Sequence, residues 1–125
     1  MTETVTAMIH VPNVSATVSW YRNIGFEVAD SYDDGGEGLS FAILTFGDSR
    51  VMFNSGGQPS AQRRREVDLY LDVNNVEDVS NRLQGKVDVV KELHETFYGM
   101  REFIIRDLNG FWITFGQVRR GFRPG

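Results

Sequence analysis

The chain has 125 residues, 41% of them hydrophobic, which is long enough to bury one core and too short for two independent domains. Its formal net charge of −4 argues against nucleic-acid binding and mildly favours cationic small molecules as partners. It contains no cysteine, which excludes disulfides, thiolate nucleophiles and sulfur-based zinc sites. The sequence shows no apolar stretch of about 18 residues and no signal-peptide pattern, so we expect a cytoplasmic protein without a membrane partner.

The first half of the sequence predicts one βαβββ module over residues 5–54. Its N-terminal residues alternate between apolar and polar, which is typical of a half-buried strand. Asn13 is a favourable N-cap for a helix over 14–24, where apolar residues recur at helical spacing, and Gly25 can end that helix. The acidic, glycine-rich stretch 30–38 predicts a loop. The strands of this module are expected at 5–12, 26–29, 39–46 and 50–54.

The second half repeats this order over residues 66–117, after a linker at 55–65 and before a basic tail at 118–125. The linker has no periodicity and includes the run Arg63–Arg65, which we interpret as a solvated charged surface rather than a phosphate site. Asn75 repeats the N-cap, and the acidic residues that follow it oppose the helix dipole. The strands of this module are expected at 67–73, 87–93, 102–106 and 111–115, with a helix from Val76 that ends before Gly85.

A β-hairpin is predicted where two runs of β-branched and aromatic residues flank Asn109-Gly110, a dipeptide that readily takes the positive φ angles of a tight turn. The residues of the final strand then alternate between two faces. One face carries Ile113 and Phe115 and suits a core. The other face suits a lined cavity and carries Trp112, Thr114 and Gly116.

The two modules are related by a constant offset, for example between Phe53 and Phe115 (115 − 53 = 62). The two predicted N-caps show the same offset (75 − 13 = 62). We interpret the chain as a tandem duplication in which two supersecondary modules share one core, giving a single domain over 1–125. The offset also matches Phe41 with Phe103, Ile43 with Ile105, and Val51 with Ile113.

Three segments of these modules carry a recognisable pattern: Asn13–Phe26, Arg101–Phe103 and Asp107–Gly110. They resemble the vicinal oxygen chelate superfamily, which includes glyoxalase I, extradiol dioxygenases, fosfomycin-resistance enzymes and bleomycin resistance proteins. The segment from Tyr98 to Asp107 most resembles the bleomycin resistance branch, where Trp-Gly-Arg-Glu-Phe precedes Arg-Asp-Pro. Here Tyr98 stands in place of that Trp, Met100 is an additional residue and Leu108 replaces the Pro.

The resemblance implies an α+β fold in which two tandem βαβββ modules form a cup-shaped mixed sheet with the helices on its outer face. It also implies a homodimer and a role in antibiotic resistance. In metalloenzymes of the superfamily the ligands come from the first and last strand of each module, positions held here by Thr6, Met52, Asp68 and Thr114. Because only Asp68 is a good ligand for a hard metal, we expect no metal and no other cofactor.

The concave face implied by the resemblance offers aromatic and thioether groups that could stack on a planar ligand, although such side chains also fill cores. Asp68 could hold a cationic group or act as a base, or it could pair with a nearby arginine. The residues predicted to bind the ligand are Met8, Met52, Asp68, Tyr70, Phe97, Tyr98, Trp112 and Thr114.

The leading hypothesis is a metal-independent protein that sequesters a planar or cationic small molecule. The alternative is a glyoxalase-like lyase or isomerase, or a dioxygenase, with a divalent metal on atypical ligands or acid–base chemistry by His10, Asp68 or Asp72. His10 and Asp72 are equivalent in the repeat (72 − 10 = 62), whereas His94 lies in a polar connection and receives no role. A third possibility is an interaction module whose cavity is filled by its own side chains.

Overall fold

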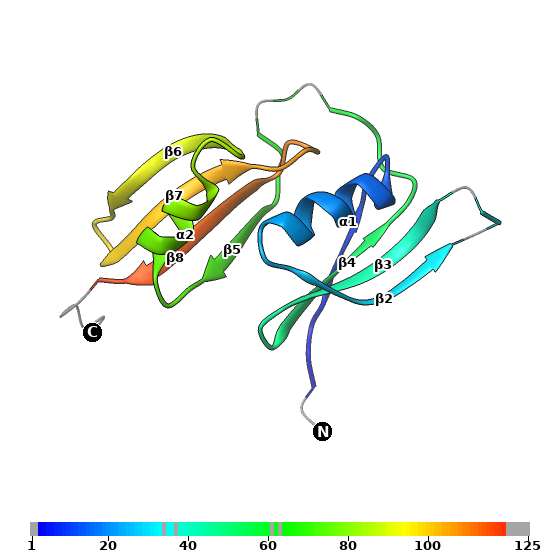
Figure 1. Ribbon diagram of the computed structural model, residues 1–125, viewed down its shortest axis with the longest axis horizontal. Coiled ribbons are helices and arrows are strands. Elements are labelled where there is room, and N and C mark those ends of the chain that lie inside the picture. Colours follow the sequence, from blue (N-terminus) through cyan, green and yellow to red (C-terminus); the bar gives the residue numbers. More distant parts are fainter. Residues whose placement is uncertain (1–2, 34, 37, 61, 63, 120–125) are drawn as a thin grey trace. The chain divides into compact units, whose positions relative to one another are not determined.

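The computed structural model describes residues 3–33, 35–36, 38–60, 62 and 64–119 (Figure 1). Within these residues the chain forms two four-stranded mixed sheets, each accompanied by one helix, which confirms the α+β class and the two βαβββ modules. The chain divides into two compact units, unit 1 (Met1–Ser60) and unit 2 (Ala61–Gly125), and the division falls inside the segment 55–65. That the two modules share one core stays a prediction. No helix in the described part of the chain combines the length and the apolar character needed to span a membrane.

Unit 1 has the strand order β1-β4-β3-β2, with β1 parallel to β4 and the other neighbours antiparallel (Figure 1). Asn13 caps α1, because its side-chain oxygen accepts a hydrogen bond from the Ala16 N–H at 2.9 Å. The helix packs on one face of the sheet, where the rings of Tyr21 and Phe53 lie with centroids 4.8 Å apart. The elements are β1 (Ala7–His10), α1 (Val14–Asn23), β2 (Glu27–Asp33), β3 (Leu39–Phe46) and β4 (Ser49–Asn54).

Unit 2 repeats this arrangement with the strand order β5-β8-β7-β6. Asn75 caps α2 by accepting from the Asp78 N–H at 3.0 Å, and α2 packs on β7 and β8. Phe103 and Phe115 stack in the core with centroids 5.0 Å apart. The elements are β5 (Asp68–Asp72), α2 (Val76–Leu83), β6 (Asp88–Glu95), β7 (Met100–Arg106) and β8 (Trp112–Val118).

The predicted loop at 30–38 is wrong in its first part. β2 continues to Asp33, and Ser31 and Tyr32 pair with residues of β3 across an antiparallel ladder. The acidic composition suggested a loop, but every residue of β2 is exposed, so polar side chains are compatible with this strand. Positions 34 and 37 lie outside the described residues.

The hairpin between β7 and β8 is confirmed, but its turn is longer than the dipeptide predicted. The buried carboxylate of Asp107 accepts hydrogen bonds from the N–H groups of Asn109 and Phe111, each at 2.8 Å. Gly110 has φ +87°, whereas only glycines take a positive φ among the described residues, so Asn109 does not. The side chain of Asp107 therefore organises this turn by satisfying backbone donors.

This longer turn changes the register of the repeat. Thr45 pairs with Arg50 across the first hairpin (50 − 45 = 5), whereas Arg106 pairs with Trp112 across the second (112 − 106 = 6). The offset between the modules is therefore one residue smaller for β3 and β7, which enter the turn, than for β4 and β8, which leave it. Since side chains alternate, that slip places different residues on the core side of β3.

The predicted matches of Phe41 with Phe103 and of Ile43 with Ile105 are accordingly wrong. In β3 the buried residues are Ala42 and Leu44. Their offset from Phe103 and Ile105 is 61 (103 − 42 = 61). The match of Val51 with Ile113 agrees with the structure, because both are buried after the turn.

Candidate functional site

The sheet of unit 2 has one face under α2 and one face without a helix. Phe103, Ile113 and Phe115 lie under α2 and are at most 2% exposed, as the alternation predicted. The strand pairing places the intervening residues together on the opposite side, which we call the open face of unit 2. Its residues include Asp68, Tyr70, Asp72, His94, Glu102, Ile104, Trp112, Thr114 and Gly116.

A buried carboxylate is the centre of the open face. Glu102 is 3% exposed, and both of its oxygens accept hydrogen bonds from phenols. The Tyr70 hydroxyl donates to Oε2 at 2.7 Å, and the Tyr98 hydroxyl lies 2.8 Å from Oε1 and 2.9 Å from Oε2. A buried charge is costly unless it is hydrogen-bonded, so the two phenols offset the free-energy cost of burying this carboxylate.

Gly116 lets Tyr70 reach that carboxylate. Tyr70 lies on β5 and Glu102 on β7, with β8 between them, and Gly116 is the β8 residue paired with Glu102. A Cβ atom on Gly116 would overlap the Tyr70 hydroxyl oxygen. The absence of a side chain at this position therefore opens the path across β8.

The cluster holds both phenols in their protonated form. The pKa of Tyr70 is raised well above its ordinary value of 10.0. The main cause is burial of the hydroxyl, and the second is its hydrogen bond to Glu102. The pKa of Tyr98 is also raised, mainly by its hydrogen bond to Glu102 and secondly by burial. Tyr70 is 47% exposed as a whole residue, but its hydroxyl lies over Gly116 against Glu102, so the desolvation acts on the titrating oxygen.

His94 lies at the edge of this cluster. It pairs with Glu102 across β6 and β7, and its Nε2 lies 4.0 Å from Glu102 Oε1. Its Nδ1 is 2.8 Å from the backbone oxygen of Glu92, which orients the ring. His94 therefore lies in β6 beside the carboxylate and not in a polar connection, while its lack of a role stays a prediction.

Trp112 and Asp68 form a second group on the open face. They pair across β5 and β8, and Arg64 contacts both of them. The Arg64 guanidinium carbon lies 4.1 Å from the centroid of the Trp112 ring, and Nη2 donates to Asp68 Oδ2 at 2.5 Å. Of the two expectations for Asp68, the structure shows the pairing with an arginine.

Two members of the arginine run contact aromatic rings, although the side chain of Arg64 is also 55% exposed, in keeping with a solvated surface. Arg64 stacks on Trp112, and Arg65 lies over Phe111 with its guanidinium carbon 4.5 Å from the ring centroid. Apolar ring faces attract flat cations, which the composition of the linker alone did not indicate. Arg63 lies outside the described residues.

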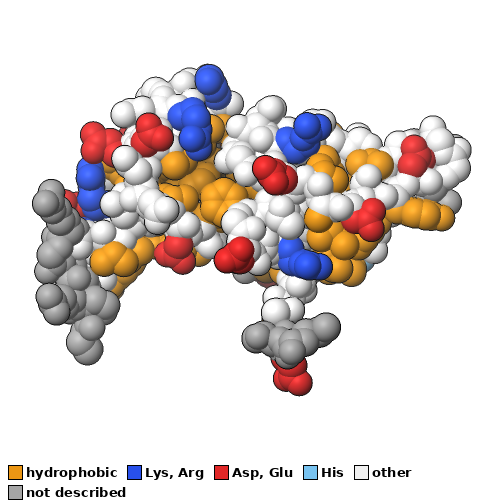
Figure 2. All heavy atoms as spheres, turned by 60° about the horizontal axis from the view of Figure 1, so that its bottom comes forward, with side chains coloured by type: hydrophobic (Ala, Val, Ile, Leu, Met, Phe, Trp, Pro, Cys, Tyr) orange, Lys and Arg blue, Asp and Glu red, His pale blue; other side chains and the backbone are white. Residues whose placement is uncertain are grey.

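The other predicted residues of unit 2 differ in exposure. Thr114 is 7% exposed on the open face, while Phe97 is 96% exposed and makes an edge contact with Tyr98 at 5.0 Å between centroids. Hydrophobic side chains reach the surface of both units (Figure 2). Phe97 is thus available to a ligand that lies over Tyr98.

Of the remaining predicted residues, Asp72 lies on the open face, where it pairs with Gly116 across β5 and β8, whereas Met8, Met52 and His10 belong to unit 1. Met8 and Met52 pair across β1 and β4 in unit 1, where the Asn54 amide nitrogen lies 3.8 Å from Met8 Sδ. The Nδ1 atom of His10 lies 3.0 Å from the Ser55 backbone oxygen, and His10 belongs to unit 1 whereas Asp72 belongs to unit 2. Joint action of His10 and Asp72, and a cleft shared by both modules, stay predictions.

Within the described residues, no group of three or more histidine, aspartate or glutamate side chains gathers as metal ligands would. The four positions equivalent to the metal ligands of the superfamily carry side chains that are poorly suited to bind a hard cation. The Asp68 carboxylate already pairs with Arg64, and Thr114 presents a hydroxyl. The donor set therefore does not fit a conventional metal centre.

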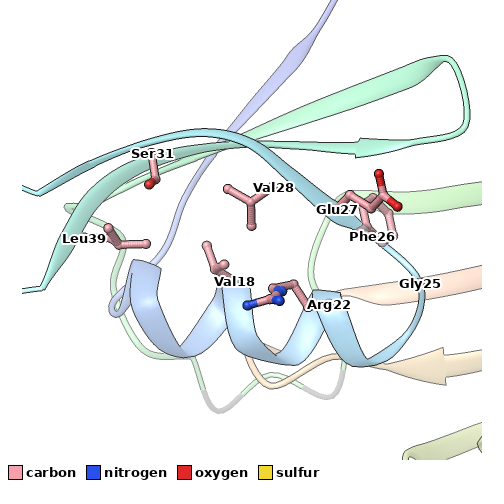
Figure 3. Close-up of a pocket in the computed structure, with 8 residues that line it drawn as sticks. All are labelled: Val18, Arg22, Gly25, Phe26, Glu27, Val28, Ser31 and Leu39. Atoms are coloured by element: carbon pink, nitrogen blue, oxygen red, sulfur yellow. The ribbon is translucent and has the colours of Figure 1, made fainter.

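Unit 1 contains a pocket of about 700 Å³ between α1 and β2 (Figure 3). Val18, Phe26 and Leu39 give it apolar walls, and Arg22 and Glu27 contribute charged groups. None of the residues predicted for ligand binding lines this pocket.

Sequence reasoning assigned Glu102, His94 and Ile104 of the open face to no site, and it placed Gly116 on the cavity-facing side of its strand without giving it a role. Two signals pointed to Glu102 and Gly116. A glutamate stands among apolar residues of a predicted strand, and a glycine stands inside another predicted strand, where it marks a close approach.

The model of the glyoxalase/bleomycin resistance protein/dioxygenase superfamily matches residues 4–115. The chain therefore belongs to this superfamily. The comparison with curated proteins finds no match.

Three solved structures illustrate the shared fold. TioX from Micromonospora sp. ML1 is 20% identical, with a TM-score of 0.73 over 94% of this chain and 99% of that chain. A bleomycin-binding protein solved in complex with bleomycin is 16% identical, with a TM-score of 0.69 over 93% and 98%. The fosfomycin resistance protein FosX from Listeria monocytogenes is 13% identical, with a TM-score of 0.71 over 94% and 93%. At these identities the likeness shows the fold.

Proposed function

We propose that this protein binds a planar or cationic small molecule on the open face of unit 2, without a metal ion. The observation that supports this most is the buried carboxylate of Glu102 beneath two half-exposed phenols. Each phenol donates its single proton to Glu102, so its oxygen is left as an acceptor towards a ligand. Hydrogen-bond chains of this kind polarise one another, which favours N–H donors and protonated amines as ligands.

The aromatic surroundings suit the same ligand class. Tyr70, Tyr98 and Phe97 offer exposed ring area, and an aromatic face attracts a cation within about 6 Å of its centroid. A ligand that combines a flat apolar body with a protonated nitrogen meets both features. Bleomycin is a reasonable first probe, because one of the structures with this fold is a bleomycin-binding protein in complex with it.

Thermal unfolding of the metal-stripped protein tests the proposal, with bleomycin and a panel of aromatic and cationic compounds. A ligand at 100 times its Kd stabilises the native state by about 2.7 kcal/mol, which raises Tm. We expect the shift to persist without metal and to be lost in Glu102→Gln, which removes the charge and preserves the shape. Glu92→Gln is the matched control, because it makes the same charge change at an exposed site on β6.

A shift that survives Glu102→Gln contradicts binding at this carboxylate. Circular dichroism of each variant shows whether the fold is intact, and Tyr70→Phe removes one donor if Glu102→Gln fails to fold. A shift that appears only after divalent metals are added supports the metalloenzyme instead.

An acid–base enzyme is the second candidate, because the imidazole of His94 lies 4.0 Å from Glu102. A histidine beside a carboxylate and two phenols can move protons at a bound substrate. Mass spectrometry of any compound that stabilises the protein, after prolonged incubation, tests this candidate. A product that is absent with His94→Gln favours the enzyme, and an unchanged compound favours the binding protein.

A homodimer and a role in antibiotic resistance complete the proposal. Both come from the resemblance to the bleomycin resistance branch. Analytical ultracentrifugation tests the dimer, and growth of an expressing strain on bleomycin tests resistance.

A further inference from the structure

Trp112 already carries a planar cation. The guanidinium of Arg64 lies on its ring, and the same guanidinium donates to the carboxylate of Asp68. Because Asp68 and Trp112 pair across β5 and β8, the ring and the carboxylate stand side by side on the open face. An aromatic ring beside a carboxylate can bind any flat cation that has N–H donors, and not only the guanidinium of Arg64.

Arg64 is held differently from its neighbour Arg65. Arg65 donates to the backbone oxygen of Asn109 at 3.0 Å and lies over Phe111, which ties the segment to the β7–β8 turn. The side chain of Arg64 is 55% exposed, and its residue belongs to no helix or strand. Arg64 can therefore leave Trp112 while Arg65 keeps the segment in place.

We infer that Trp112 and Asp68 form a subsite for a planar cationic group of the ligand, and that Arg64 occupies this subsite until the ligand displaces it. The group is a guanidinium, an amidinium or a protonated nitrogen heterocycle. This inference rests on the proposed binding function and names the chemistry of one part of the same face. The two expectations for Asp68, a bound cation and a pairing with arginine, then describe one site with two occupants.

The competition has a measurable consequence. A subsite that is filled by its own chain binds an external cation more weakly, in proportion to the fraction of molecules in which it is empty. The contacts of Arg64 are an exposed stacking interaction and a partly exposed ion pair, each of modest strength. Removing Arg64 is expected to tighten the binding of a planar cation roughly threefold to tenfold.

Nuclear magnetic resonance with benzamidinium measures this directly. The chain has two tryptophans, so the indole N–H of Trp112 reports on the subsite while that of Trp20 serves as an internal reference. We expect Arg64→Ala to lower the Kd for benzamidinium. Arg22→Ala is the matched control, because it removes the same charge from an exposed arginine of unit 1 and should leave the Kd unchanged.

Further variants in the Arg64→Ala background assign the two contacts. Asp68→Asn should weaken benzamidinium binding. Trp112→Leu should abolish it, as measured through the resonances of benzamidinium itself because this variant lacks the indole reporter. Neutral benzamide should bind more weakly than benzamidinium throughout. The inference is overturned if Arg64→Ala binds no better than Arg22→Ala, or if benzamide binds as well as benzamidinium. Failure here leaves the Glu102-dependent thermal shift intact, and failure of that shift leaves benzamidinium binding at Trp112 intact, so the two outcomes can be told apart.

Discussion

The open face of unit 2 differs sharply from the equivalent face of unit 1, although both rest on the same strand order. With the register of the structure, Glu102 corresponds to Phe41 (102 − 41 = 61). Unit 1 thus carries an aromatic ring where unit 2 carries a buried carboxylate. The two further positions of the cluster, Tyr70 and Gly116, correspond to Met8 and Asn54 (70 − 8 = 62; 116 − 54 = 62).

The contrast can be traced to a small number of positions on the two faces. In unit 1 the Asn54 side chain stands beside Met8 and fills the space that Gly116 leaves open in unit 2. In unit 2 that space admits the long side chain of Tyr70, which reaches across β8 to Glu102. The cores have changed less, because hydrophobic burial constrains them in both units. Three positions on the opposite side therefore account for the different chemistry.

The first prediction concerns the part that the two units share. Phe53→Ala and Phe115→Ala should each destabilise the protein by about 3–5 kcal/mol, because both rings are fully buried and their removal leaves a cavity. Urea unfolding followed by circular dichroism measures the free energy of unfolding. Val67→Ala, at a half-exposed site, is the control and should change it by less than about 0.5 kcal/mol. A cost below about 1 kcal/mol for either phenylalanine would show that the two cores are not equivalent.

The second prediction converts one face towards the other. Gly116→Asn places a side chain where the Tyr70 hydroxyl lies, so Tyr70 must swing away and Glu102 loses one donor. The expected loss is about 1.5–3 kcal/mol of unfolding free energy, the typical contribution of one hydrogen bond to a charged group, while the Tyr98 hydroxyl stays beside both carboxylate oxygens. Urea unfolding measures it.

A double-mutant cycle makes this second prediction specific. Adding Tyr70→Phe to Gly116→Asn should cost little more, because both changes remove the same hydrogen bond. The reverse conversion in unit 1, Asn54→Gly, should cost only about 0.5–1 kcal/mol, since it removes a weak contact and loosens the strand. If the losses of unfolding free energy from Gly116→Asn and Tyr70→Phe add fully, the missing side chain of Gly116 is not what lets Tyr70 reach Glu102.

The sequence was sufficient for most of the scaffold. Alternation along most of the strands predicted the buried faces. Asn13 and Asn75 predicted where the two helices begin, because each side chain caps a backbone N–H group. The repeat failed only in β3. There one extra residue in the later turn shifts the offset, and the carboxylate of Asp107 that organises this turn could not be identified from the dipeptide Asn109-Gly110.

The site was harder to predict than the scaffold, for a physical reason. Alternation correctly grouped Tyr70, Trp112 and Thr114 on one face, but it says nothing about which side chains reach across a strand. The bond from Tyr70 to Glu102 depends on the missing side chain of Gly116 and on the pairing of Glu102 with Gly116 across β7 and β8, and alternation alone predicts neither. Arg64 lies in a segment without periodicity, so the sequence pattern could not predict that its side chain contacts Trp112.

The last and smallest effect is a dependence on alkaline pH that unit 2 should show. The pKa of Tyr70 lies above its unfolded value of 10.0, so above pH 10 the unfolded chain releases a proton that the folded chain retains. Stability is then unchanged below pH 10 and declines as the pH rises towards the raised pKa, and Tyr98 adds to the decline in the same direction. Urea unfolding between pH 8 and about 11 measures the slope, which should be smaller in Tyr70→Phe and smaller still in Tyr70→Phe combined with Tyr98→Phe. Glu102→Gln should also flatten it, because the neutral amide no longer favours protonated phenols. An unchanged slope in all three variants would assign the decline to other groups and remove the Glu102 network as its cause.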